Sequence, residues 1–187
     1  MDSKKGGDIL NRDAFNKIFW GLLFTMINFR IMGFDVMPDI VGYILISQAL
    51  GDLLQYNDFF VKARKLNLFM MLFSILSIYQ PKGQSFGGGN FFILTIGLIA
   101  FIIDLMLMYN LFMGISDMAY QNQKIYLYNE AQDKWKQYLY LSIAAIIGGI
   151  LVLIPFIFIV YMIILVIASL VIMISILKFM KECGDVL

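Results

Sequence analysis

The feature that most constrains this chain is an uncharged apolar run of about 40 residues that ends at Lys178. As a single helix this run would reach roughly 60 Å, about twice the thickness of the hydrocarbon core of a bilayer. It therefore has to fold back on itself. Pro155 is the natural break, because proline lacks an N–H group and clashes inside a helix. The run thus predicts one helix from Tyr138 to the residue before Pro155, and a second helix after it.

Four more apolar segments precede this run. Hydrophobic residues make up 61% of the chain and charged residues only 14%, whereas about a quarter of the residues in soluble domains are charged. The sequence therefore predicts an all-α integral membrane six-helix bundle over residues 18–178. A cytoplasmic N-terminal segment (1–17) and a cytoplasmic tail (179–187) would flank this transmembrane domain. The six predicted spans are 18–31, 38–55, 66–79, 91–113, 138–154 and 155–178.

Positive charges are unevenly distributed among the connections between these spans. If the N-terminus is inside, only Arg30 and Lys82 of the 14 Lys and Arg residues lie in outer segments. Cationic residues accumulate on the cytoplasmic side, so this asymmetry predicts that both the N and C termini are cytoplasmic. Residues 114–137 would then form a short amphipathic cytoplasmic connection between helices four and five. A cleaved signal peptide is the alternative interpretation of the first apolar run, although no small-residue cleavage site follows it.

An arginine and two aspartates lie in the predicted outer turn between the first two spans. Asp35 is expected to cap the second helix, and Asp39 adds negative charge near the positive end of that helix. Arg30 is costly at membrane depth unless it is neutralised, so we expect it to pair with one of these carboxylates. This outer-turn charge cluster is interpreted either as a structural clasp or as part of an outward-facing site.

The same region carries a resemblance. The stretch WGLLFTMINFRIMGFDVMPDIVGYILI, residues 20–46, contains the pattern Asp-x-x-Pro-Asp-x-x-Gly-Tyr-Ile-Leu. It resembles an uncharacterised family of small multi-spanning membrane proteins of Firmicutes. The later GISDMAYQNQ and AQDKWKQYL are similar to the cytoplasmic connection of that family. The resemblance covers about half of the chain. It implies a multi-pass protein of the bacterial plasma membrane and carries over no activity.

Two carboxylates inside the predicted spans are candidate binding residues, because a charge within a bilayer is costly. Asp52 and Asp104 each lie about 20 Å along their helices from the outer end, and therefore at similar depth. Gln48 lies one turn from Asp52, and Asn110 lies below Asp104. If the carboxylates face each other, these residues would bind a cation or share a proton. The alternative is that water reaches Asp52 and that a neighbouring Tyr or Asn satisfies Asp104.

Two pairs of small residues lie in the fifth span at four-residue spacing, Ala144 with Gly148 and Ala145 with Gly149. Small residues at this spacing allow helices to approach closely in a membrane. We interpret them as helix-packing residues, with a substrate groove as the alternative.

Several other kinds of chemistry find no support in the composition. The chain has no His and a single Cys, which excludes an internal disulfide and disfavours zinc sites and Ser–His or Cys–His catalysis. The 13 methionines follow no metal-binding spacing, so we interpret them as apolar filler rather than copper ligands. A net charge of +1 gives no basis for nucleic-acid binding. We expect no metal, no cofactor and no catalytic residue.

The sequence favours a polytopic bacterial membrane protein that is not an enzyme and that binds, or helps to transport, a small solute or cation within the bundle. The alternative is an accessory, regulatory or immunity protein that acts by binding another membrane protein. A third hypothesis, an intramembrane enzyme with Asp52 and Asp104 as a dyad, has no supporting motif. The expected partners are the lipid bilayer and, in addition, a membrane protein or a second copy of the chain.

Cysteine labelling in intact cells tests the predicted topology. In a Cys183→Ser background, Gln123→Cys is expected to react only after the membrane is permeabilised, because it lies in the predicted cytoplasmic connection. Lys82→Cys is expected to react from outside and serves as the matched control. Labelling of Gln123→Cys from outside would contradict the six-span arrangement.

Overall fold

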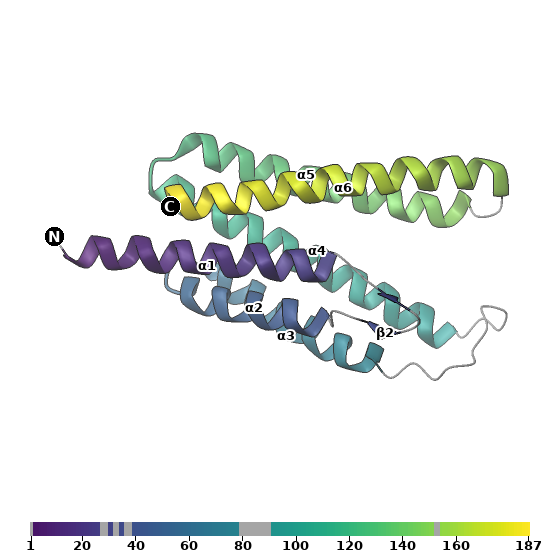
Figure 1. The fold of residues 1–187 in the computed structure, drawn as a ribbon, viewed down its shortest axis with the longest axis horizontal. Coiled ribbons are helices and arrows are strands. Elements are labelled where there is room, and N and C mark those ends of the chain that lie inside the picture. The colour runs from purple at the N-terminus through teal and green to yellow at the C-terminus, as the bar shows by residue number, and fades with distance from the viewer. Residues whose placement is uncertain (1, 27–29, 32–33, 36–38, 79–90, 152–153) are drawn as a thin grey trace.

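The described part of the chain folds into six α-helices and one short β-hairpin in this computed structural model (Figure 1). The structure describes residues 2–26, 30–31, 34–35, 39–78, 91–151 and 154–187. The helices are α1 (Asp2–Met26), α2 (Asp39–Leu53), α3 (Asp58–Ile78), α4 (Phe91–Gln121), α5 (Ile125–Leu151) and α6 (Pro155–Val186), and the strands are β1 (Arg30–Ile31) and β2 (Phe34–Asp35).

Each helix packs on the next one along the chain, and α6 returns to pack on α1. The helices run antiparallel to their neighbours, so both termini, the α2–α3 turn and the α4–α5 turn gather at one end of the bundle (Figure 1). We call this the terminal end. The predicted all-α, six-helix bundle is therefore confirmed, and the helix break predicted at Pro155 is confirmed as well, because α6 begins there.

The predicted amphipathic connection over residues 114–137 is not a separate element. Helix α4 continues to Gln121 and α5 begins at Ile125, so only a tight turn joins them. Gln123 adopts a positive φ of 60° in this turn, and the Lys124 N–H donates to the Ala119 carbonyl at 2.8 Å. Apolar residues continue at helical spacing through the polar segment and are fully buried, which keeps both helices intact. These residues are Ile115, Met118, Ala119, Leu127 and Ala131.

Three other helices also extend beyond the apolar segments that predicted them, and one of these is α6, which continues to Val186 through the predicted tail rather than ending at Lys178. Helix α1 begins at Asp2 rather than near residue 18, and α3 begins at Asp58 rather than at Leu66. Hydropathy marks the apolar centre of a helix, whereas the helix itself ends only where its backbone hydrogen bonding stops. Lys82, predicted to lie in an outer loop, falls outside the described residues.

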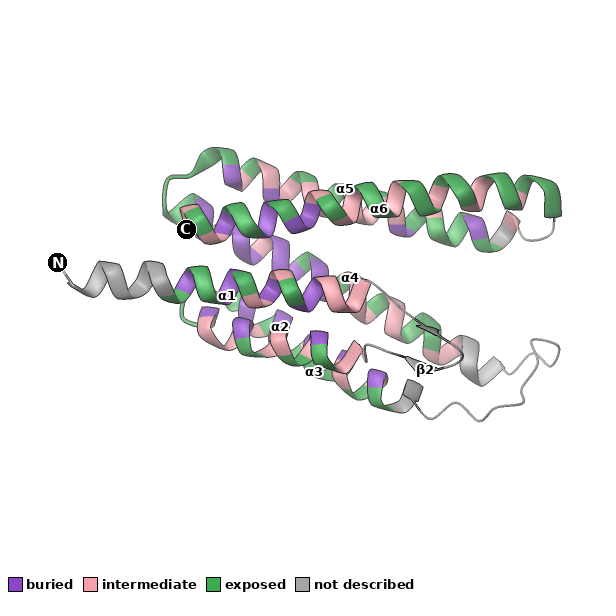
Figure 2. Ribbon diagram, viewed as in Figure 1, coloured by how far each residue is buried: buried purple, intermediate pink, exposed green. Residues whose placement is uncertain are grey.

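Most of the buried core lies in the half of the bundle nearest the terminal end (Figure 2). Phe15, Phe60, Phe112 and Phe179 come from four different helices, and each is at most 1% exposed. The rings of Phe112 and Phe179 lie 6.4 Å apart, within the range of favourable aromatic contact. By contrast, no residue of α6 from Pro155 to Ser175 is buried.

Two described helices are long and apolar enough to cross a membrane, Thr95–Gln121 of α4 and Pro155–Val186 of α6. The core helix of a soluble protein passes the same test, but such a helix is mostly buried. None of the most apolar stretch of α6 is buried within the bundle, and only 28% of that of α4 is. The other described helices do not meet this criterion of length and hydropathy. The criterion therefore supports two of the six predicted spans.

The predicted packing role of the small residues in α5 is confirmed for one of the two pairs. The Tyr161 hydroxyl of α6 donates to the carbonyl of Ala144 at 2.7 Å, and a Cβ on Gly148 would lie 3.0 Å from the Tyr161 ring. Ala145 and Gly149 are exposed, and a Cβ on Gly149 would meet nothing within 4 Å. One face of α5 therefore packs on α6, and the adjacent face remains uncovered.

Helices α1 and α2 cross at two glycines. A Cβ on Gly42 would lie 2.6 Å from the carbonyl oxygen of Gly21, and a Cβ on Gly21 would lie 2.8 Å from the carbonyl oxygen of Gly42. Both distances are far below van der Waals contact, so the two backbones approach this closely only because neither residue has a side chain. The crossing brings Tyr43 and Ile46 of α2 against the last turns of α1.

Replacing Gly42 with valine is expected to destabilise the bundle by about 2 kcal/mol, because overpacking a close contact forces the backbones apart. The loss is measured as a fall in thermal unfolding temperature of the detergent-solubilised protein. Gly97→Val is the matched control, since a Cβ on Gly97 of α4 would meet nothing within 4 Å. Equal losses in the two variants would contradict the close crossing.

Candidate functional site

A cavity of about 180 Å³ lies among α1, α2, α4 and α5. One water molecule takes up about 30 Å³ of liquid, so this volume suits a small ion or a few water molecules. Most of the lining side chains are apolar, and four carry polar groups. The lining residues are Leu22, Thr25, Met26, Tyr43, Ile46, Asp104, Leu107, Met108 and Tyr138. We call this space the Asp104 cavity.

Asp104 is directed into the bundle by its position on α4. Leu107, Met108 and Leu111 follow it by three, four and seven residues and therefore share its helix face. Each of these three is at most 2% exposed, so this face is the buried one. An acidic residue at a core position of an otherwise apolar helix thus places its carboxylate in the interior.

Two tyrosines surround the carboxylate of Asp104. The hydroxyl of Tyr138 on α5 donates a hydrogen bond to Asp104 Oδ2. Tyr43 lines the same cavity from α2. Asn67 of α3, which is fully buried, donates to the backbone carbonyl of Tyr43 at 2.7 Å and so holds this part of α2 in place.

The Asp104 cavity contains a carboxylate whose bonded partner is neutral. Among the Lys and Arg residues whose side chains the structure describes, none forms an ion pair with Asp104. A carboxylate in apolar surroundings is stabilised either by taking up a proton or by pairing with a cation, because an isolated buried charge is costly. The arrangement is therefore suited to binding a proton or a small cation.

Asp52 lies elsewhere and has a different partner. Lys17 Nζ of α1 donates to Asp52 Oδ2 at 3.1 Å and also pairs with Asp13 at 2.7 Å. The hydrogen bond to Asp13, followed by that to Asp52, raises the pKa of Lys17 above its usual value. Asp52 thus ties α2 to α1 close to the terminal end and does not line the Asp104 cavity.

Counting residues placed the two carboxylates at similar depth, but the structure does not bring them together. Asp52 lies nine residues beyond Tyr43, about 13 Å farther along α2 toward the terminal end. The count assumed that all helices start at the same level, whereas α4 extends well beyond α2 at the opposite end (Figure 1). The predicted alternative, in which a neighbouring tyrosine satisfies Asp104, describes what is found.

The other two candidate ligands do not line the cavity either. Gln48 is exposed, and Asn110 Nδ2 donates to the Met106 carbonyl of its own helix at 2.7 Å. Neither Tyr43 nor Tyr138 stands out in the sequence as a site residue. Tyr138 stands where a charged aromatic segment meets the apolar run, a position equally typical of an aromatic residue at a membrane interface. Only its hydrogen bond to Asp104 distinguishes a residue of the cavity from an aromatic residue at a membrane interface.

The outer-turn charge cluster is arranged partly as expected. Strands β1 and β2 pair antiparallel with Arg30 opposite Asp35, so the backbone sets these two residues side by side. Asp35 belongs to β2, and the described part of α2 begins at Asp39; the expected cap on the second helix involves residues 36–38, which lie outside the described residues. Asp39 lies in the first turn of α2, as expected, one turn before Tyr43 of the Asp104 cavity.

Comparison with known protein families, curated proteins and solved structures finds no match to this chain.

Replacing Tyr138 with phenylalanine is expected to lower the free energy of unfolding by about 1 to 3 kcal/mol, because it leaves the half-buried Asp104 carboxylate without its donor. Tyr140→Phe, two residues further along α5, is the matched control, since that side chain is 68% exposed. Thermal unfolding of both variants at neutral pH measures the difference. A loss no larger than that of Tyr140→Phe would show that the hydroxyl of Tyr138 is not needed.

Proposed function

We propose that this chain is a multi-pass protein of the bacterial plasma membrane that binds a small monovalent cation, or a proton, in the Asp104 cavity and serves in solute binding or transport rather than catalysis. The observation that carries the proposal is the Asp104 carboxylate, which lies in an apolar cavity with a neutral tyrosine as its bonded partner.

The bilayer placement rests mainly on α6. Its residues from Phe156 to Ile174 expose isoleucine, valine and leucine side chains on several faces, and such a surface is stable only when apolar material covers it. The resemblance to small multi-spanning proteins of Firmicutes supports the same location. The concentration of Lys and Arg at one end of the predicted spans supports cytoplasmic termini.

The size of the Asp104 cavity narrows the class of ligand. Pockets for drug-sized organic molecules measure about 300 to 1,000 Å³. A cavity of about 180 Å³ is smaller than this and favours an ion or a very small amine. It contains one carboxylate among the described residues, which matches a single positive charge, with the hydroxyl oxygens of Tyr43 and Tyr138 as further acceptors.

Cation binding is tested by thermal unfolding of the purified protein in rising concentrations of sodium, potassium or methylammonium chloride, with choline chloride as the control for ionic strength. A ligand that binds only the folded state stabilises it in proportion to the logarithm of its concentration above Kd. At least one small cation is expected to raise the unfolding temperature progressively with concentration, and choline is expected not to. Protons compete for the same carboxylate, so the effect should weaken as the pH falls.

The variant Asp104→Asn is expected to abolish this stabilisation, because the amide is neutral. Asp52→Asn is the matched control, since Asp52 lies outside the cavity and should leave the cation effect intact. Stabilisation that is the same for all cations, or that survives in Asp104→Asn, would overturn the proposal.

A second candidate function is that of an accessory protein bound to another membrane protein. The observation that favours it is the uncovered face of α5, where Ala145 and Gly149 are exposed. Small residues of this kind allow another helix to approach closely in a membrane. A stoichiometric partner that co-purifies in mild detergent and is lost in Gly149→Leu would support this function, whereas Gly97→Leu should keep the partner.

A further inference from the structure

A groove of about 620 Å³ runs between α1 and α6 near the terminal end. Its lining combines four charged side chains with an aromatic pair, of which Trp20 is exposed and Phe19 half-buried. The residues are Arg12, Asp13, Asn16, Phe19 and Trp20 of α1 and Met180, Lys181, Gly184 and Asp185 of α6. The groove is open to the surface and distinct from the Asp104 cavity, with which it shares no residue.

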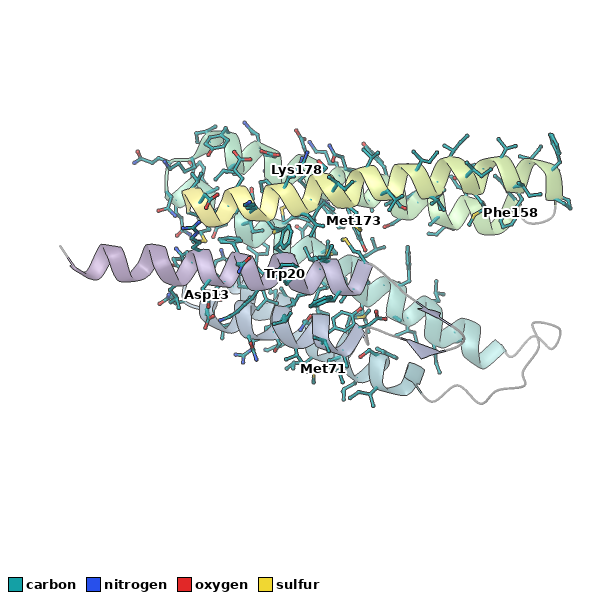
Figure 3. The ribbon with its side chains drawn as sticks, viewed as in Figure 1. Asp13, Trp20, Met71, Phe158, Met173 and Lys178 are labelled. Atoms are coloured by element: carbon teal, nitrogen blue, oxygen red, sulfur yellow. The ribbon has the colours of Figure 1, made fainter. Side chains whose placement is uncertain are left out.

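The groove is polar at one end and aromatic at the other. Asp13 lies closer to the terminal end than Trp20, which stands farther along α1 (Figure 3). The ring of Trp20 is 46% exposed and contacts Phe19 edge-on, with the ring centroids 5.5 Å apart. Tryptophan with one face uncovered is typical of the headgroup level of a membrane. Beyond it, α6 continues with exposed apolar residues such as Val171 and Ile174.

The groove contains equal numbers of cationic and acidic side chains, and one of the acidic ones, Asp13, also pairs with Lys17 of α1 at 2.7 Å. Arg12 contacts Asp185 at 3.5 Å, with both side chains largely exposed. Lys181 is exposed and forms no ion pair with a described residue. Two cations and two carboxylates thus line one opening. A purely anionic headgroup would meet repulsion from the carboxylates, whereas a zwitterion can satisfy both signs.

We propose that the groove between α1 and α6 binds a zwitterionic phospholipid with a primary ammonium, of the phosphatidylethanolamine class. Arg12 and Lys181 contact the phosphate, because guanidinium and ammonium groups pair well with phosphate oxygens. Asp185 and Asp13 accept hydrogen bonds from the lipid ammonium, and Trp20 packs beside the glycerol and upper acyl region. A choline headgroup has no N–H to donate, so it binds less well. This inference rests on the bilayer placement proposed above.

Fluorescence of Trp20 provides a direct test. The chain has two tryptophans, so Trp135→Phe leaves Trp20 as the single reporter and keeps a ring against Tyr109, which Trp135 contacts at 5.3 Å. The full chain is reconstituted into phosphatidylcholine vesicles with an equal minor fraction of brominated phosphatidylethanolamine, phosphatidylglycerol or phosphatidylcholine. We expect the brominated phosphatidylethanolamine to quench Trp20 several-fold more than the other two lipids do.

Substitutions within the groove should remove the preference without preventing insertion. Asp185→Asn and Lys181→Gln are each expected to bring quenching by the three lipids to the same level, and Asp185→Glu should retain the preference. Lys178→Gln is the matched control, because Lys178 is an exposed cation of α6 that does not line the groove. A preference that persists in both Asp185→Asn and Lys181→Gln would overturn the assignment.

The outcomes separate this inference from the proposed function. Equal quenching by all three lipids overturns the groove site and leaves the bilayer placement standing. Stronger quenching by phosphatidylglycerol overturns it in favour of an anionic lipid. Absence of quenching by any lipid overturns both the groove site and the bilayer placement.

Discussion

The candidate site depends on the close crossing of α1 and α2 at Gly21 and Gly42. Because neither residue has a Cβ, the backbones approach until each Cβ position is filled by the carbonyl of the other helix. This contact brings Ile46 and Tyr43 against the end of α1, where Leu22, Thr25 and Met26 complete one wall of the Asp104 cavity. A wider crossing would open that wall to the surroundings.

Asp104 of α4 contributes the carboxylate to another wall of the same cavity. An apolar helix that carries a carboxylate on its buried face needs a hydrogen-bond partner for that group. Tyr138 of α5 provides this partner through its hydroxyl. A hydroxyl stabilises the carboxylate less than a cation would, and this is the basis on which cation binding is proposed for the site. Asp52 differs in this respect, because Lys17 already neutralises it. Two aspartates of similar sequence setting thus have different partners, a lysine for Asp52 and a tyrosine hydroxyl for Asp104.

The uneven distribution of the core accounts for the rest of the architecture. Near the terminal end the helices bury phenylalanines and close into a ring, so this half holds together by its own packing. From Pro155 to Ser175, α6 has no buried residue and exposes many of its apolar side chains (Figure 2). The groove between α1 and α6 lies near the terminal end, where charged residues replace apolar ones. In the proposed membrane setting, it would meet the headgroups while the exposed part of α6 meets the acyl chains.

Local sequence determined the number of helices, but not the short strands β1 and β2. The uncharged run had to fold back, Pro155 marked where, and the spacing of small residues in α5 indicated a packing face that Tyr161 indeed covers at Gly148. Asp104 could be recognised as a candidate because a carboxylate in an apolar helix stands out by composition alone. Hydropathy did not locate the ends of α1, α3, α4 and α5, since polar helical turns look like connections when only apolar content is read.

Tertiary structure alone decided which groups meet. The choice between Asp52 and Tyr138 as partner of Asp104 depends on how far α4 is displaced along the bundle relative to α2 and α5, and a residue count carries no information on such displacement. Helical periodicity is a property of one segment, so it predicts the face on which a side chain lies. The depth and orientation of one helix against another arise from contacts between segments distant in the chain, such as Gly21 with Gly42 and Asn67 with the Tyr43 carbonyl.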